Sequence, residues 1–152
     1  MERTALFSKD KQYRYRLSRQ WDVKKPMILF IMHNPSTADA FKEDRTLTRI
    51  INYAKDWGYG GLYVGNLFPY CSVKPQRNKT LPKAIIQRNQ KHIKAMNQKV
   101  AITVLAWGNK QNIPKWIKKN IPNTYCIIQN KKNIPKHPLY LKKNLKPTPF
   151  DS

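Results

Sequence analysis

The pattern of apolar and polar positions predicts four buried strands that alternate with amphipathic helices. The first strand is predicted for residues 27–32, where six consecutive apolar residues stand between a proline and a polar loop. An uninterrupted apolar run of this length is typical of a strand that is buried on both faces. Residues 62–68, 100–106 and 124–128 have a similar character. We therefore expect a parallel sheet that is covered by helices on both sides.

Helical spacing and turn residues predict the elements between these strands. Apolar residues recur at the spacing of one helix face between residues 47 and 54, with Asp44 placed to cap the first turn and Gly58 to end the last. A second helix is predicted for residues 82–98, with a proline at its first position. A short helix is predicted around Trp116. The side chains predicted to face the core from the two longer helices are Leu47, Ile50, Ile51 and Ala54, and Ile85, Ile86, Ile93 and Met96.

The order of these elements predicts the fold class. Strand, helix, strand is a βαβ unit, whose right-handed crossover makes its two strands parallel. The sequence therefore predicts a single α/β domain over residues 1–152, a three-layer αβα sandwich with a central four-stranded parallel sheet. Residues 13–19 alternate aromatic or apolar with basic side chains. This period of two predicts a further strand, with a basic face outward, that forms a hairpin with its neighbours.

The net charge of the chain indicates the class of its partner. Thirty Lys and Arg against eight Asp and Glu give a formal net charge of +22, which attracts polyanions. Nucleic acid, single- or double-stranded DNA, is the leading partner class. An acidic membrane surface is the alternative, but the charges are not gathered on one amphipathic segment. No apolar run approaches the length of a bilayer span and no hydrophobic signal region is present, so we expect a cytoplasmic protein. We also expect a monomer.

The sequence lacks the residues that several classes of site require. Cys71 and Cys126 are isolated, and His33, His92 and His137 are scattered, so we expect no metal and no cofactor. No GxxxxGK or GxGxxG loop follows a predicted strand, so a nucleotide-binding role lacks its phosphate cradle. No paired carboxylates stand at the strand ends, which argues against a two-carboxylate glycosidase.

Polar residues gather where the predicted strands end. Asn34 follows the first strand, Asn66 ends the second, Trp107 follows the third, and His137 lies in a basic segment beyond the fourth. Open α/β sheets bind their ligands at the carboxyl ends of the strands, so we expect a common site there. Pro35 restricts the backbone of Asn34 and presents its side chain rigidly.

Each of these residues also has a structural interpretation. The loop after the first strand can be a polar turn in which Ser36 or Thr37 caps a helix. Asn66 can cap a turn, Trp107 can belong to the core, and a lone histidine such as His137 is often a solvated surface residue. Their common position at the strand ends is what favours a site.

Four short motifs in this order resemble a known family. They are Asn-Pro-Ser-Thr-Ala-Asp at residues 34–39, Trp-Gly-Tyr-Gly-Gly at 57–61, Asn-Leu-Phe at 66–68 and His-Pro-Leu-Tyr-Leu at 137–141. They resemble the small bacterial and phage proteins grouped as domain of unknown function 1643. A wider likeness is to the uracil-DNA glycosylase superfamily. There an Asp-Pro or Asn-Pro loop follows the first core strand, a second strand ends in Asn, a Trp-Gly turn follows the third strand, as at Trp107-Gly108 here, and a His-Pro loop containing Leu closes the site.

This resemblance implies roles for the residues. Asn34 would position the attacking water, and His137 would hydrogen-bond the departing base. Asn66 would read the edge of the flipped pyrimidine, and Leu141 would fill the gap in the base stack. The substrate-binding residues would be His33, Pro35, Ser36, Phe41, Asn66 and Trp107, and the DNA-binding residues Lys136, Tyr140, Leu141, Lys142 and Lys143.

The chain also departs from the superfamily pattern. Families with Asp at the position of Asn34 are generally the more active, so the resemblance leaves the rate of excision open. The tyrosine and glycine-rich continuation of the loop is absent, and Phe41 is placed as a stacking platform only by its proximity.

The sequence thus predicts a DNA glycosylase that flips uracil, or a related altered base, and hydrolyses its N-glycosidic bond. A non-catalytic nucleic-acid-binding protein on the same fold is the alternative, because a charge of +22 exceeds what catalysis requires. An enzyme acting on another modified base or nucleotide is a third possibility, since related folds host different activities.

Overall fold

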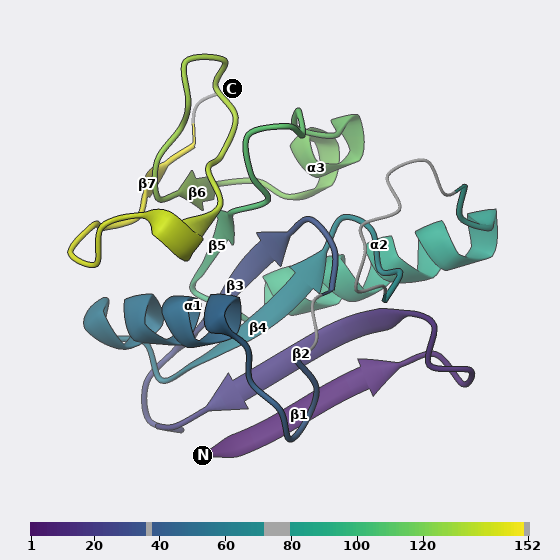
Figure 1. Ribbon diagram of the computed structural model, residues 1–152, viewed down its shortest axis with the longest axis horizontal. Helices are drawn as coiled ribbons and strands as arrows, with labels where there is room; N and C mark the ends of the chain where they lie inside the picture. The colour runs from purple at the N-terminus through teal and green to yellow at the C-terminus, as the bar shows by residue number, and fades with distance from the viewer. Residues whose placement is uncertain (36–37, 72–79, 151–152) are drawn as a thin grey trace.

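A seven-stranded mixed sheet organises the chain in the computed structural model, which describes residues 1–35, 38–71 and 80–150 (Figure 1). The strand order is β1-β2-β4-β3-β5-β6-β7. The four central strands are parallel, and the strands outside them pair antiparallel. The strands are β1 (Glu2–Phe7), β2 (Arg14–Gln20), β3 (Met27–Met32), β4 (Gly61–Asn66), β5 (Ile102–Leu105), β6 (Thr124–Cys126) and β7 (Thr148–Pro149). The helices are α1 (Arg45–Asp56), α2 (Lys83–Gln98), α3 (Lys115–Asn120) and the 3-10 helix η1 (Pro138–Tyr140).

The predicted α/β class is confirmed, and the sheet is wider than predicted. Its parallel centre corresponds to the four predicted strands, while β1 and β2 extend one edge and β7 extends the other. The sequence of β1, three polar residues followed by three apolar ones, and the two-residue length of β7 give no alternating signal. Both strands owe their conformation to pairing with a neighbour. The predicted hairpin is formed by β1 and β2.

The side chains of β3 alternate between the two faces of the sheet. Ile28 and Phe30 pack in the cluster that contains the buried residues of α1, whereas Leu29 and Ile31 pack with α2 and α3. The two longer helices therefore lie on opposite faces (Figure 1). Within the described ranges, no helix is long and apolar enough to cross a membrane.

The predicted boundaries of α1 are confirmed by its hydrogen bonds. The side chain of Asp44 accepts a hydrogen bond from the backbone N–H of Leu47 at 2.8 Å, which satisfies one of the free donors of the first turn. Gly58, with φ of +87°, follows the helix in the left-handed conformation that glycine adopts most easily.

The prediction for α2 was wrong at its first turns. Pro82 precedes the helix as its N-cap residue, and Ile86 is 41% exposed instead of facing the core. The reason is that this end of α2 extends past the strands in Figure 1, so the sheet does not cover it. The buried side of the helix is formed by Asn89, Ile93 and Met96.

The segment after β6 returns across α1 and brings its residues to the edge of the sheet. The Tyr53 hydroxyl donates to the carbonyl of Lys142, and the Trp57 indole N–H donates to the carbonyl of Leu145 at 2.9 Å. Leu141 and Leu145 pack against the core cluster around α1. These contacts hold η1 against α1 (Figure 1).

Candidate functional site

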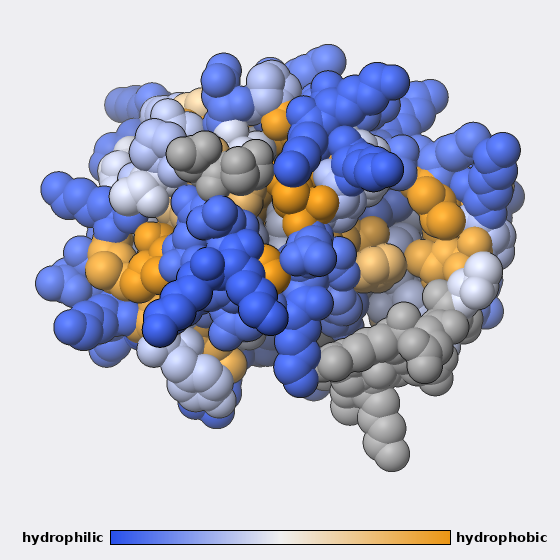
Figure 2. Space-filling view, turned by 90° about the horizontal axis from the view of Figure 1, so that it is seen from above, coloured by the Kyte–Doolittle hydropathy of each residue, from blue (hydrophilic) through white to orange (hydrophobic). Residues whose placement is uncertain are grey.

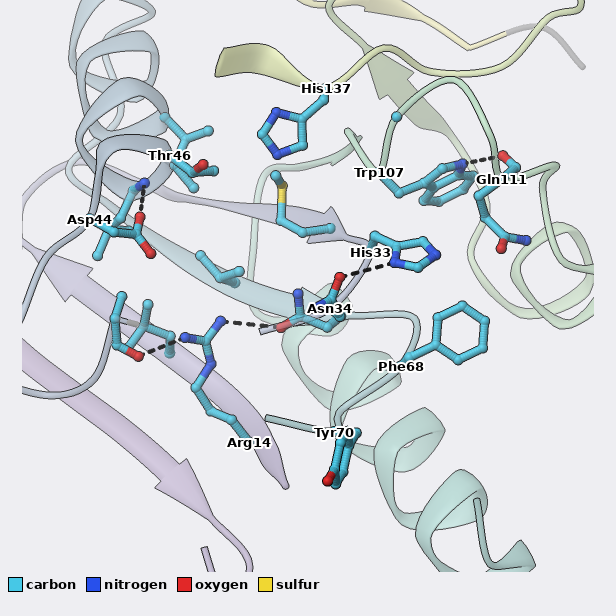
Figure 3. Close-up of a pocket in the computed structure, with 18 of the residues that line it drawn as sticks. Arg14, His33, Asn34, Asp44, Thr46, Phe68, Tyr70, Trp107, Gln111 and His137 are labelled. Carbon is cyan, nitrogen blue, oxygen red and sulfur yellow. Dashed lines mark hydrogen bonds between the residues drawn. The ribbon is translucent and has the colours of Figure 1, made fainter. Parts of the chain in front are cut away.

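A pocket of about 650 Å³ lies where β3, β4 and β5 end. Asn66 pairs with Met32 in the parallel register, and the backbone N–H of Phe68 donates to the carbonyl of His33 at 2.9 Å, so the two strand ends lie level. The pocket is lined by strand-end residues, by the start of α1 and by the segment before η1 (Figure 3). The lining includes Arg14, Met32, His33, Asn34, Asp44, Leu47, Asn66, Phe68, Tyr70, Trp107, Gly108 and His137.

The structure brings together the four strand-end residues that the sequence singled out. Asn34, Asn66, Trp107 and His137 all line this pocket, although they lie far apart in the chain. The parallel arrangement of β3, β4 and β5 causes this, because it directs all three carboxyl ends to one edge.

Asn34 is held by its immediate neighbours. Its Nδ2 donates to the carbonyl of Pro35 at 3.3 Å, so its Oδ1 lies towards Nδ1 of His33 at 3.0 Å. Because a carbonyl oxygen only accepts, this contact places a proton on Nδ1 of His33. The His33 ring is tilted against Phe68, with 5.0 Å between ring centroids. His33 and Pro35 thus fix the orientation of the Asn34 amide.

The floor of the pocket contains a buried cation that the sequence interpretation missed. Arg14 is 3% exposed, and its guanidinium donates to the carbonyl of Ala38 at 2.8 Å and to Oδ1 of Asn66 at 3.2 Å. Asn89 donates from Nδ2 to the backbone carbonyl of Asn66 at 2.8 Å and so supports the end of β4 from the α2 side. Figure 3 shows Arg14 reaching from β2 towards the centre of the pocket.

The predicted outward basic face of β2 was therefore wrong. Arg14 and Arg19 are both buried, and Arg19 donates to the backbone carbonyls of Asp39 and Lys42. Backbone carbonyls between Ala38 and Lys42 accept these hydrogen bonds. This segment is distant from β2 in sequence, so the alternation of apolar and basic residues along β2 does not reveal the contact.

His137 faces the pocket from the opposite side (Figure 3). Its Nδ1 accepts a hydrogen bond from the backbone N–H of Leu139 at 3.2 Å, so the neutral ring carries its proton on Nε2. Burial lowers the pKa of His137, and the attraction of Asp44 opposes only part of this effect. The ring is therefore neutral at neutral pH and offers Nε2–H as a donor.

We expect the His137 ring to titrate below its ordinary pKa of 6.5. The folded chain then binds this proton more weakly than the unfolded chain. The contribution of His137 to the free energy of unfolding is complete above pH 6.5 and is lost as the pH falls from there through the folded pKa. Proton NMR titration checks this, with the ring signals assigned by their loss in His137→Gln. A midpoint at or above the ordinary value would contradict it.

The Trp107-Gly108 turn supports His137. Gly108 has φ of +106°, its N–H donates to the carbonyl of Pro135 at 3.0 Å, and a Cβ placed on it would lie 3.6 Å from Cβ of His137. Trp107 is 4% exposed, and its indole N–H donates to the carbonyl of Gln111 at 2.6 Å. Trp107 is thus both a core residue and part of the pocket wall.

Other predicted site residues lie elsewhere. Phe41 is 92% exposed and does not line the pocket, because the Asp39 side chain holds its backbone in a turn directed to solvent. Phe68 occupies the aromatic position at the pocket wall instead. Pro35 is buried behind Asn34 without lining the pocket, and Ser36 lies outside the described residues.

The predicted DNA-binding residues follow His137 in the chain. Tyr140 is 84% exposed, and Lys142 and Lys143 are also exposed. Lys136 is partly buried. Leu141, the predicted wedge, is partly buried against the core cluster around α1 and does not project freely.

Comparison with known proteins gives one result. The family model described as "Protein of unknown function (DUF1643)" matches residues 14–139, a span that contains every pocket residue named above. No curated protein and no solved structure matches the chain. In the part of the chain that the structure describes, no group of three or more His, Cys, Asp or Glu side chains is arranged to hold a metal ion.

Proposed function

The chain belongs to the DUF1643 family of proteins of unknown function, and we propose that it is a DNA glycosylase that excises uracil, or a related altered base, from DNA. The observation that carries this proposal is that two polar groups line the same pocket from opposite sides. They are the Nε2–H of neutral His137 and the fixed amide of Asn34. The pocket volume of about 650 Å³ lies within the range of small-molecule sites.

The chemistry needs oriented donors rather than many acids. Cleavage of the N-glycosidic bond develops positive charge on the sugar and negative charge on the base, so a preorganised N–H aimed at the base lowers the barrier. In this proposal His137 donates from Nε2 to the departing base. Asn34 positions the water whose oxygen bonds to the sugar carbon as the base leaves with the electron pair of the broken bond.

The surroundings of the pocket suit a polyanionic substrate. Figure 2 shows hydrophilic side chains over most of the face seen from above, and the chain carries 30 Lys and Arg in all. In this proposal Lys136, Lys142 and Lys143, which lie on the same segment as His137, contact the phosphates of the DNA. The exposed Tyr140 ring, three residues after His137, is available to stack on a base.

The decisive experiment is incubation of the protein with single- and double-stranded oligonucleotides that contain one uracil, followed by alkali to cleave abasic sites. Strand cleavage at the uracil is expected, with no cleavage of matched thymine oligonucleotides. A second candidate, a non-catalytic nucleic-acid-binding protein, is favoured by the net charge of +22. It predicts binding of both oligonucleotides without cleavage of either.

Burial distinguishes Leu141, the predicted wedge, from Tyr140, whose exposed ring could fill the gap in the base stack instead. We expect Tyr140→Ala to slow excision from duplex DNA by about tenfold, because loss of one base-stacking contact costs roughly 1–3 kcal/mol. Single strands, whose bases are already unstacked, should be affected less. Leu141→Ala should instead lower the free energy of unfolding, by about 1 kcal/mol, since this side chain is partly buried.

Excision rates on both strand forms and urea unfolding curves of the two variants measure this difference. Duplex excision that is slowed by Leu141→Ala alone, with unchanged stability, would return the wedge role to Leu141.

A further inference from the structure

We propose that Asp44 is a catalytic residue of this pocket and that its carboxylate stabilises the positive charge that develops on the sugar; the proposal rests on the glycosylase activity proposed above. The bond between the sugar carbon and the base breaks with its electron pair on the base. The oxygen of water then bonds to the sugar carbon, and a proton of that water ends on the base. Asp44 forms no bond in this sequence and contributes its charge while the sugar is cationic.

Asp44 brings a negative charge to a pocket whose other proposed catalytic groups are neutral. Among the residues that the structure describes, it is the only acidic side chain that lines the cavity. The amide of Asn34 carries no charge, and the neutral ring of His137 adds none. Without Asp44, a cationic sugar would therefore meet no negative charge from the lining of this pocket.

The start of α1 fixes the carboxylate of Asp44 in place. Its Oδ1 accepts from the backbone N–H of Leu47 at 2.8 Å, and its backbone carbonyl accepts from the N–H of Thr48 at 3.0 Å. A carboxylate can accept about four hydrogen bonds, so capping the helix leaves it able to interact with a ligand. A group that is already oriented in the free protein needs no reorganisation when charge develops, which makes its electrostatic stabilisation effective.

The charge of Asp44 acts on groups on two other sides of the pocket. Burial lowers the pKa of Arg14 to about 10, and the attractions of Cys71 and Asp44 oppose this effect. Burial also lowers the pKa of His137, and again the attraction of Asp44 opposes it. Figure 3 shows Asp44 on the α1 side of the pocket, with His137 above it and Arg14 below it in this view. A cationic sugar bound in this cavity therefore lies within the field of the same carboxylate.

The buried charge of Arg14 makes this carboxylate more important. Arg14 remains charged at neutral pH, and a positive charge beside the pocket opposes the formation of a cationic sugar. Its hydrogen bonds to the carbonyl of Ala38 and to Oδ1 of Asn66 hold it on the floor of the pocket. The opposite charge of Asp44 offsets this repulsion, so its loss would leave an unfavourable field at the sugar.

The variant Asp44→Asn separates catalysis from helix capping. Asparagine caps helices about as well as aspartate does, but it carries no charge. We expect uracil excision to slow by about a hundredfold, the scale on which the loss of one preorganised electrostatic group acts, while the thermal unfolding temperature is maintained. Asp44→Ser, which also caps without charge, replaces Asp44→Asn if that protein does not fold. Asp56→Asn is the matched control, because Asp56 is exposed at the other end of α1, and it should excise uracil at the wild-type rate.

Binding of a charged sugar analogue tests the same role without catalysis. The probe is a single-stranded oligonucleotide in which a pyrrolidine replaces one sugar, with a ring nitrogen that stands at the position of the reacting carbon and is protonated at neutral pH. Fluorescence anisotropy compares it with the uncharged tetrahydrofuran analogue in the same sequence. We expect the wild type and Asp56→Asn to prefer the pyrrolidine by at least about tenfold, the scale of a contact between charged groups, and Asp44→Asn to lose this preference. Equal affinity of the wild type for the two analogues would overturn the proposal.

The two proposals fail in different ways. Uracil excision at the same rate by the wild type and by folded Asp44→Asn would assign Asp44 to helix capping alone and leave the glycosylase. Absence of excision by the wild type would remove the glycosylase. A preference for the pyrrolidine that disappears in Asp44→Asn would then still support a site for a cationic sugar at Asp44.

Discussion

Replacement of His137 by alanine is expected to slow uracil excision by about a hundredfold, the scale observed when one preorganised donor to a developing anion is removed. The ring is neutral, its tautomer is set by the backbone N–H of Leu139, and it faces the pocket, so the donor needs no rearrangement during the reaction. Single-turnover excision from a uracil-containing oligonucleotide measures the effect. Affinity for undamaged DNA should hardly change, because in the proposed mechanism His137 contacts the base and not the phosphates.

Two further variants make this result specific. His92→Ala is the matched control, because His92 stacks on Tyr15 outside the pocket, with 5.1 Å between ring centroids. It should excise uracil at the wild-type rate. Asn34→Ala should slow excision as well, because in the proposed mechanism the Asn34 amide orients the attacking water. Full activity in both His137→Ala and Asn34→Ala would refute the proposed site and leave the fold unaffected.

Local sequence patterns were sufficient for the centre of the fold. The apolar run of β3 is set by burial on both faces, and Asp44 and Gly58 mark the ends of α1 through interactions with their own neighbours in the chain. The edge strand β7 and the bounds of β1 were not predicted, because both strands owe their conformation to pairing with a neighbouring strand. Ile86 faces solvent for a similar reason: the tertiary structure determines where the sheet beneath α2 ends, and the helix pattern alone does not reveal this.

In the candidate site, too, the residues marked by local sequence patterns were predicted and those that depend on tertiary contacts were missed. Asn34, Asn66, Trp107 and His137 were found because each stands near the end of a predicted strand or in the segment that follows the last one. Arg14 was missed because alternation on β2 assigned it to solvent, and its burial depends on the loop that carries Ala38. The aromatic residue of the pocket, likewise, is Phe68 rather than Phe41, since proximity in sequence does not determine which side chain faces the cavity.

Affinity for DNA is expected to fall by roughly a thousandfold between about 50 and about 200 mM salt, the response of a protein that contacts at least about six phosphates. The formal net charge of +22 on 152 residues motivates this expectation, because each neutralised phosphate releases about one counterion. Fluorescence anisotropy with a labelled oligonucleotide at several salt concentrations gives the slope of log affinity against log salt. The slope should be similar for unrelated sequences, since phosphate contacts carry no sequence information.

Reversal of charge at chosen positions locates the contacts. Lys142→Glu with Lys143→Glu should reduce the magnitude of the slope by about two units, because each lysine that contacts a phosphate contributes about one. Lys91→Glu with Lys94→Glu changes the total charge equally but lies on α2, on the far face of the sheet from α1, and should reduce the slope much less. Equal losses from the two pairs would show that DNA is attracted by total charge alone. If the affinity of the unaltered protein for DNA barely changes with salt concentration, DNA is excluded as the partner that this positive charge attracts.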